Sequence, residues 1–324
     1  MTYLVTGATG FIGSNIVEQL VGEGQNVLGL SNVGPSARQQ RLAAGSTLQF
    51  TVGDVRDQKQ LETLIKQHGV RRIIHAAVIT SDAEREKSQG PQIVDVNLRG
   101  AAVVATAAAN CDIERFTLVS SAGVFSTHNL PDGEIVEETQ PHSVDTLYGV
   151  GKSAAETIVA RICSLNATPY VIGRVATAFG PWEHDTGYRD TLSPIYQLTK
   201  KALAGEMAVL GRDKKSNWHY SRDAANALIT LTRSTKEPEH RDYNLGPQWT
   251  WPLSRWCNLL KDRYPSFDYQ IASEGNVELY GLNDGGLLSG SRFAKEFGPT
   301  ASFDLDSAFA DFMEWIDQTE INID

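Results

Sequence analysis

The glycine-rich segment near the start of the chain constrains the fold more than any other feature. TGATGFIG, residues 6–13, follows an apolar strand candidate at 2–6 and opens a helix candidate at 11–23. A strand, a tight glycine turn and a helix in this order begin a βαβ unit that binds a dinucleotide, whereas isolated glycines indicate only a turn. The order of the three parts favours the dinucleotide interpretation.

Each glycine in this segment has a physical task. Gly7 lets the chain turn sharply, Gly10 lets backbone approach a diphosphate, and Gly13 lets the helix pack closely on the strand. The N–H groups of the first helical turn, at Phe11 and Ile12, would then face the phosphates.

Short apolar segments alternate with longer helical patterns through the first half of the chain. The strand candidates are residues 2–6, 26–30, 48–52, 71–76, 115–120 and 169–173, and the helix candidates are 11–23, 57–67, 91–110 and 148–165. Strands that are apolar on both faces and separated by helices indicate a parallel sheet. We therefore expect an α/β fold with a doubly wound, Rossmann-like parallel sheet and ligands at the carboxyl ends of its strands.

The pattern changes after about residue 175. Aromatic, charged and turn-forming residues become frequent, and helix candidates follow at 192–204, 221–234, 253–262 and 305–318. We expect an NAD(P)-binding Rossmann domain over 1–174 and a smaller C-terminal lobe over 175–324 that mainly binds substrate. A strand near 242–246 is expected to rejoin the main sheet.

The composition is acidic, which excludes several classes of partner. A formal net charge of −10 and a pI of about 5.2 disfavour nucleic acid and membranes, because phosphate binding requires clustered lysine and arginine. No apolar run approaches the roughly 20 residues of a membrane span, and the N-terminus does not resemble a secretion signal. Three scattered cysteines form no metal-binding pattern. We expect a cytoplasmic protein that acts on a small molecule and binds no metal.

The end of the second strand candidate bears on the choice of dinucleotide. An aspartate there would bind the adenosine ribose and repel a 2′-phosphate, but Ser31 and Asn32 occupy the position. Arg38 and Arg41 follow within reach of a phosphate, so NADP is slightly favoured over NAD; two solvated surface arginines are the alternative. Asp54 is expected to contact the adenine, with a helix cap as its alternative role.

Tyr148 and Lys152 are four residues apart in LYGVGKSAAE, so they would share one face of a helix. A free tyrosine has a pKa of about 10. An ammonium group at about 4 Å, at an effective dielectric constant of about 20, would bring that pKa close to neutral and make the phenol a general base. Gly149 and Gly151 would let a flat cofactor lie close to the helix. The alternative is an unrelated core tyrosine and surface lysine.

Two serines follow one another at the end of the strand candidate at 115–120. A hydroxyl there could hydrogen-bond the substrate oxygen and stabilise developing negative charge. We assign this role to Ser121, with Ser120 as the second choice. The alternative is a serine that only satisfies backbone groups at the strand end.

Together these segments resemble the extended short-chain dehydrogenase/reductase family, also described as the NAD-dependent epimerase/dehydratase family. The resemblance covers most of the chain and rests on TGATGFIG at 6–13, GDVRD at 53–57, HAA at 75–77, VNLRG at 96–100, VSSAGVF at 119–125, YGVGK at 148–152, FGP at 179–181 and YNLG at 243–246. It implies that Ser121, Tyr148 and Lys152 form a catalytic triad. It further implies that the cofactor is lined by Gly7, Gly10, Gly13, Asp54, Val55, Ala76, Ala77, Val78 and Val175, with Asn97 in support and His75 in a structural role.

Departures from the family pattern bear on the reaction. Thr177 stands near an asparagine that is frequent in nucleotide-sugar enzymes, and Ser216 and Asn217 stand where those enzymes tend to have an arginine for the diphosphate. Ala122 and Gly123 replace the Asp-Glu pair of the 4,6-dehydratases. The departures argue against a nucleotide-diphosphate substrate and against water elimination.

The later part of the chain resembles, more loosely, family members that act on small sugar acids. The substrate would then be a small polyhydroxylated molecule. The candidate partners of a carboxylate are Arg174, Arg189, Lys214 and Lys215, and the candidate pocket walls are Trp182, His184, Tyr188, Trp218 and His219. Solvated charge and core packing are the alternatives for these residues.

The helix candidates at 91–110 and 148–165 carry few charges. In the family the equivalent helices often form a dimer interface, so the resemblance implies a homodimer. Burial inside the monomer is the alternative.

The leading functional hypothesis is an NAD(P)-dependent oxidoreductase. It would act on a secondary alcohol or ketone of a sugar or sugar acid by a Ser–Tyr–Lys proton relay with hydride transfer. One alternative is an NAD-dependent sugar epimerase that retains its cofactor. Another is a catalytically silent, redox-sensing dinucleotide-binding protein, which the intact triad disfavours.

Overall fold

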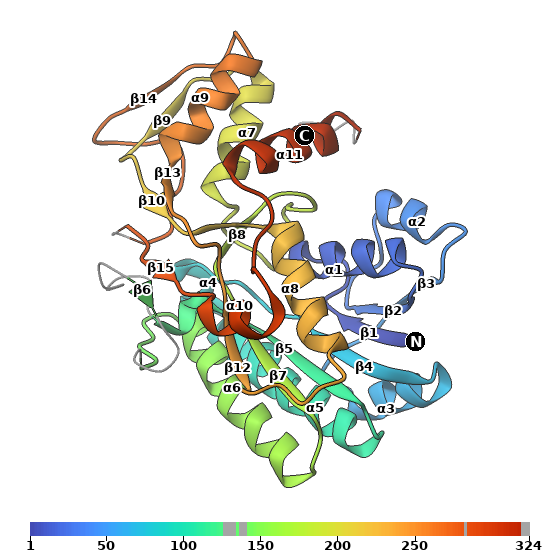
Figure 1. Ribbon diagram of the computed structural model, residues 1–324. Helices are drawn as coiled ribbons and strands as arrows, with labels where there is room; N and C mark the ends of the chain where they lie inside the picture. The colour runs from blue at the N-terminus through green and yellow to red at the C-terminus, as the bar shows by residue number, and fades with distance from the viewer. Residues whose placement is uncertain (126–133, 136–140, 282–283, 319–324) are drawn as a thin grey trace.

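The computed structural model describes residues 1–125, 134–135, 141–281 and 284–318 (Figure 1). Its centre is a seven-stranded parallel sheet in the order β12-β7-β5-β4-β1-β2-β3. The strands are β1 (Thr2–Thr6), β2 (Asn26–Ser31), β3 (Leu48–Val52), β4 (Val70–His75), β5 (Arg115–Ser121), β7 (Tyr170–Val175) and β12 (Asp242–Leu245). The doubly wound, Rossmann-like fold is confirmed, and β12 is the strand expected near 242–246.

Helices cover both faces of this sheet. On one face lie α1 (Phe11–Gly22) and α8 (Ser221–Arg233); on the other lie α3 (Gln58–Gln67), α5 (Gly100–Asn110) and α6 (Leu147–Leu165) (Figure 1). Successive residues of a strand point to opposite faces, so Leu4 joins the core beneath α3, α5 and α6 whereas Val5 joins the core beneath α1 and α8. Burial on both faces explains why the strands are apolar throughout.

The helix expected at 91–110 is part of a longer helical region. α4 (Ala83–Val94) begins after Asp82, whose side chain accepts a hydrogen bond from the backbone N–H of Arg85. A π-helical turn, Asp95–Arg99, then leads into α5. Pro91 lies inside α4, after Gln89, whose backbone angles are not helical, so the helical region begins earlier than expected, at Ala83. A further short helix, α2 (Ala37–Ala43), follows β2.

The C-terminal part of the chain builds a lobe with its own aromatic core (Figure 1). Its helices are α7 (Pro194–Ala204), α9 (Leu253–Arg263) and α11 (Leu305–Asp317). Its short strands pair as β8 (Thr177–Phe179) with β11 (Trp218–Tyr220), β9 (Ala208–Leu210) with β14 (Tyr269–Ile271), and β10 (Lys215–Ser216) with β13 (Trp251–Pro252). β6 (Glu134–Ile135) pairs with β15 (Leu287–Leu288), and α10 (Ser291–Phe297) packs against β12. None of the helices in the described ranges has the length and apolarity needed to cross a bilayer.

Candidate active site

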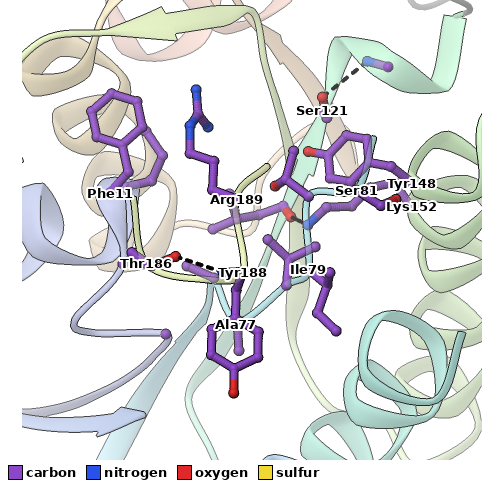
Figure 2. Close-up of a pocket in the computed structure, with 18 of the residues that line it drawn as sticks. Phe11, Ala77, Ile79, Ser81, Ser121, Tyr148, Lys152, Thr186, Tyr188 and Arg189 are labelled. Carbon is purple, nitrogen blue, oxygen red and sulfur yellow. Dashed lines mark hydrogen bonds between the residues drawn. The ribbon is translucent and has the colours of Figure 1, made fainter. Parts of the chain in front are cut away.

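A cavity of about 990 Å³ lies at the carboxyl ends of the parallel strands, between the sheet and the C-terminal lobe (Figure 2). The sheet side contributes the glycine loop and the residues that follow β2, β3, β4 and β5. The lobe contributes Tyr188, Arg189 and the segment 278–281. Doubly wound sheets bind their ligands at this position, and the volume is that of a cleft for a large small-molecule ligand.

The glycine loop forms a cradle for an anion. Gly7 has a left-handed φ of +68°, and a Cβ there would lie 2.7 Å from the backbone nitrogen of Ala77. A Cβ on Gly13 would lie 2.0 Å from the carbonyl oxygen of Gly7, so α1 packs directly on the loop. Gly10 begins α1 without a capping side chain, and the first helical turn carries no acidic residue. The loop therefore presents helix N–H groups and a partial positive charge to the cavity, which fits the diphosphate of a dinucleotide.

Most residues predicted to contact the cofactor line this cavity. They are Gly7, Gly10, Phe11, Ile12, Gly13, Ser31, Asn32, Asp54, Val55, Ala76, Ala77, Val78, Tyr148, Lys152 and Val175. The Ser31 hydroxyl accepts a hydrogen bond from the backbone N–H of Thr9 at 3.0 Å, which braces the glycine loop.

Asp54 is a cavity residue and not a helix cap, because Asp57 caps α3. Both carboxylate oxygens of Asp54 accept hydrogen bonds from Arg56, at 2.9 and 2.6 Å, and these bonds lower the pKa of the Asp54 carboxyl. Arg56, in the same GDVRD segment, also lines the cavity, although no role was predicted for it.

Arg38, which was predicted to meet the 2′-phosphate, does not line the cavity. Its guanidinium carbon lies 4.7 Å from the ring centroid of Trp182 and 4.0 Å from that of Trp315, outside the cavity. The neighbouring Gln39 donates hydrogen bonds to the glycine loop and to α1, at 3.1 and 2.8 Å, which turns Arg38 toward the C-terminal lobe. Burial lowers the pKa of Arg38 to about 10. Arg41 is exposed and lies outside the cavity, so the prediction of NADP loses its main support.

Asn97 does not line the cavity either. Its side-chain oxygen accepts a hydrogen bond from the backbone N–H of Ile79 at 2.8 Å, and its amide donates to the Ile79 carbonyl at 2.9 Å. Asn97 thus fixes the loop after β4, whose residues do line the cavity. His75 is buried below this loop, with Nδ1 2.7 Å from the Thr6 hydroxyl, and burial lowers the pKa of His75 to about 3.

The start of α6 brings Tyr148 next to Ser121 (Figure 2). Thr146 caps the helix by accepting a hydrogen bond from the backbone N–H of Gly149 at 3.0 Å. The Ser121 hydroxyl lies beside the Tyr148 ring and accepts a hydrogen bond from the backbone N–H of Gly123 at 3.0 Å, whereas Ser120 donates to buried Glu156 at 2.5 Å. Of the two serines, Ser121 therefore faces the tyrosine.

Lys152 shares a helix face with Tyr148, but its charge does not act as expected. Its Nζ lies 5.9 Å from the Tyr148 ring centroid and donates to the Val119 carbonyl at 2.6 Å. Burial raises the pKa of Tyr148, while the nearby Ser121 hydroxyl and the charge of Arg189 act in the opposite direction. Burial also lowers the pKa of Lys152 to about 8, against the raising effect of Glu156. In the protein by itself the lysine does not make the phenol acidic.

Of the four cations predicted to meet a carboxylate, Arg189 alone lines the cavity. Arg174 is buried in ion pairs with Glu156 at 2.7 Å and Asp242 at 2.9 Å, and Lys214 and Lys215 lie elsewhere in the lobe. Of the candidate pocket walls, Tyr188 lines the cavity; those outside it are Trp182, His184, Trp218 and His219. Tyr280 is a further cavity residue from a segment without any motif.

The departures from the family pattern fall into two groups. Ala122, Gly123 and Thr177 line the cavity, so their lack of charge affects the site directly. Ser216 and Asn217 are buried outside it, where the Asn217 amide donates to two backbone carbonyls at 2.8 and 2.7 Å.

The chain matches the model of the NAD dependent epimerase/dehydratase family over residues 3–246. The low-salt glycan biosynthesis protein Agl12 of Haloferax volcanii is 28% identical over 252 residues, which are 76% of this chain and 77% of that protein. A UDP-glucose 4-epimerase of Neisseria meningitidis serogroup C is 30% identical over 165 residues, which are 49% of this chain and 47% of that protein. The solved structure of UDP-glucuronic acid 4-epimerase from Bacillus cereus in complex with UDP-glucuronic acid and NAD has a TM-score of 0.81 at 19% identity, and the match covers 98% of this chain and 99% of that one. The chain therefore belongs to the NAD dependent epimerase/dehydratase family of enzymes.

Proposed function

We propose that the protein is an NAD-dependent dehydrogenase that interconverts a secondary alcohol and a ketone on a sugar or sugar acid. One observation carries the proposal: a single cavity joins the phosphate-binding glycine loop to Ser121, Tyr148 and Lys152. NAD-dependent chemistry on sugars agrees with the family. The choice of a net redox reaction within that chemistry is our proposal.

In the proposed mechanism, Tyr148 moves the proton and Ser121 holds the substrate oxygen from the other side. The raised pKa of Tyr148 keeps the phenol protonated at neutral pH, so it is ready to donate a proton in ketone reduction. Lys152 is anchored by the Val119 carbonyl and has further N–H donors for the cofactor ribose. Bound NAD supplies the hydride chemistry.

We propose NAD in preference to NADP. Among the described residues that line the cavity, the cations are Arg56, Lys152 and Arg189. Arg56 is already bonded to Asp54 and Asp95, at 2.6 and 2.5 Å. With Arg38 held on the tryptophans, none of the described residues that follow β2 supplies the cavity with a cation for a 2′-phosphate, and Arg56, which follows β3, is already paired.

A sugar epimerase is the second candidate, because the 30% identical relative is a UDP-glucose 4-epimerase. It would use the same three side chains and keep its cofactor bound. The family pattern would have a diphosphate-binding arginine near Ser216 and Asn217, and the described residues that line the cavity include no cation from that segment, which weighs against a nucleotide sugar.

A turnover screen separates the candidates. The protein would be incubated with sugar acids, aldoses, polyols and UDP-glucose, each with NAD and with NADP. A ketone product with stoichiometric NADH supports the dehydrogenase, and a stereoisomer without net NADH supports the epimerase. Cofactor binding without turnover across the whole panel contradicts both.

We also propose a homodimer formed through α4 and α6. Val94 and Val150 are 41% and 42% exposed, and a shallow apolar groove lies beside them. α5 packs between α3 and α6, so burial within the monomer accounts for its own apolar sequence. Sedimentation of wild-type protein and V150E tests the proposal: a wild-type monomer contradicts it.

A further inference from the structure

We propose that Arg189 binds one carboxylate of the substrate, so that the substrate is a sugar acid and not a neutral sugar, a sugar phosphate or a nucleotide sugar. The inference rests on the proposed function and names the substrate class of the same site. It begins from the observation that Arg189 is the one cation that the lobe contributes to the described wall of the cavity.

The backbone of Arg189 is held in place by the Rossmann half of the molecule. Arg189 forms a parallel β-bridge with Thr80, in the segment that follows β4. The N–H of Thr80 donates to the Tyr188 carbonyl at 2.8 Å, and the N–H of Asp190 donates to the Thr80 carbonyl at 3.1 Å. The Asp190 carboxylate also pairs with Arg85 at 2.6 Å. These bonds fix the position of Arg189 relative to the cofactor loop.

Hydrogen bonds from a single guanidinium nitrogen orient the Arg189 side chain. Nη2 donates to the Glu183 carboxylate at 3.0 Å and to the Tyr280 hydroxyl at 3.1 Å, and Cζ lies 5.1 Å from the Phe11 ring centroid. Glu183 is itself held by the backbone N–H and hydroxyl of Ser193, each at 2.6 Å. Nη1 donates to none of the described residues. Nε has no partner among them either, but it is fully buried, so Nη1 supplies the unused donors of this fixed, planar group.

Arg189 lies at the right place to read a group next to the reacting carbon. In Figure 2 it lies between Phe11, at the start of α1, and the Ser121–Tyr148 pair. Its charge acts on the Tyr148 phenol. A substrate hydroxyl that meets Tyr148 would bring a carboxylate on the same short carbon chain toward Arg189. The free Nη1 would donate a charge-assisted hydrogen bond to that carboxylate.

The charge at this end of the cavity suits a single anion. Lys152 is committed to the Val119 carbonyl, and Arg56 lies near β3 with its own carboxylates. Arg189 is partly balanced by Glu183, and Glu86 and Glu278 also line the cavity. A guanidinium that already shares its charge with Glu183 can pair with at most one further carboxylate, whereas a phosphate ester or a diphosphate carries more charge and requires more cations.

The test compares wild type, R189Q, R189K and R255Q on aldonates and uronates, each matched with the alditol of the same carbon chain. Arg255 is exposed on α9 and lies outside the cavity, so R255Q controls for the loss of a positive charge. We expect R189Q to raise KM for the acids by about 10- to 100-fold, the range of a charge-assisted hydrogen bond, and to leave KM for the alditols unchanged. R189K keeps the positive charge but loses the planar guanidinium, so its KM for the acids should lie between those of wild type and R189Q.

A binding measurement makes the result independent of turnover. Sugar acids should perturb the fluorescence of protein-bound NADH in wild type and R255Q but not in R189Q, while NADH affinity stays the same in all four proteins and shows that each of them is folded. Equal losses for acids and alditols, or unchanged acid binding in R189Q, would overturn the role of Arg189. Tighter binding of sugar phosphates or UDP-glucose than of acids would also overturn it. Turnover of alditols alone would leave the proposed dehydrogenase standing and remove only this inference.

Discussion

The cofactor side and the substrate side of the cavity are built in opposite ways. On the cofactor side, the important residues lie within short stretches: the loop at 6–13, and one helical turn that holds Tyr148 and Lys152. On the substrate side, Arg189 and Tyr280 come from segments 91 residues apart and meet through one hydrogen bond. Local spacing determines the first arrangement, and tertiary packing determines the second. A sequence of this kind therefore says more about its cofactor than about its substrate.

The largest effect is expected for Tyr148→Phe, which removes one hydroxyl from the cofactor side. If this hydroxyl moves the proton, kcat should fall at least ~100-fold. NADH affinity should change little, because the glycine loop is untouched. Steady-state turnover and NADH fluorescence titration measure the two quantities.

Tyr264→Phe is the matched control, because Tyr264 lies in the lobe, outside the cavity, and bonds the sulfur of Met313. It should leave kcat near the wild-type value. A Y148F protein that kept more than about a tenth of its activity would be incompatible with general acid catalysis by this phenol.

Gly13→Ala should cause the next largest effect, because the added methyl group clashes with the glycine loop. The new Cβ would lie 2.0 Å from the Gly7 carbonyl oxygen, so α1 must move away from the loop. We expect a loss of about 1–3 kcal/mol in the free energy of unfolding, as for other overpacked sites, and weaker NADH binding. Gly22→Ala, in the same helix but with no atom within 4 Å of the new Cβ, should be neutral or stabilising by up to about 1 kcal/mol. Similar destabilisation by the two substitutions would mean that the loop does not need close packing.

The same contrast explains what the sequence could and could not predict. The strands and the glycine loop follow from apolar patterns and from steric demands within a few residues, and the structure has them where they were expected. Asn97 shows where prediction from the sequence stops. The family resemblance places it near the cofactor, but its side chain bonds the backbone of Ile79, 18 residues away. Arg189 and Tyr280 line the cavity only because distant segments pack together. No periodicity or spacing encodes such contacts.

The buried ammonium of Lys152 gives a pH-dependent prediction for the cofactor side. Its pKa is lowered to about 8, so it loses its proton, and a donor to the cofactor ribose, as the pH rises through about 8. NADH affinity should then fall by up to ~10-fold, the lower range for a charge-assisted hydrogen bond. His75, with a pKa of about 3, does not titrate there. K152M should bind NADH more weakly but with a flat profile, and a profile equal to that of wild type would assign the titration to another group.

The same group links pH to stability with a definite sign. The pKa of Lys152 is about 8 in the folded protein and has its ordinary value of 10.5 in the unfolded chain. At pH values between these two, the unfolded chain binds more protons at this lysine than the folded one. The contribution of Lys152 to the free energy of unfolding should therefore increase with pH across this window. Denaturant unfolding of wild type and K152M at both ends of the window measures it, and a larger increase in K152M would contradict the sign.

The smallest effect is expected for Arg38→Met, and it tests where the boundary between the two sides lies. Arg38 follows β2, a strand on the cofactor side, in the sequence. Its guanidinium nevertheless lies over Trp182 and Trp315 of the lobe. Methionine keeps the apolar contact and loses the cation–π interaction, so the free energy of unfolding should fall by only about 1 kcal/mol. The ratio of NADH to NADPH affinity should stay unchanged in R38M and in R41M, its exposed control. A selective loss of NADPH binding in R38M would return this arginine to the cofactor side, and would show that local spacing outweighs the packing of the lobe at this position.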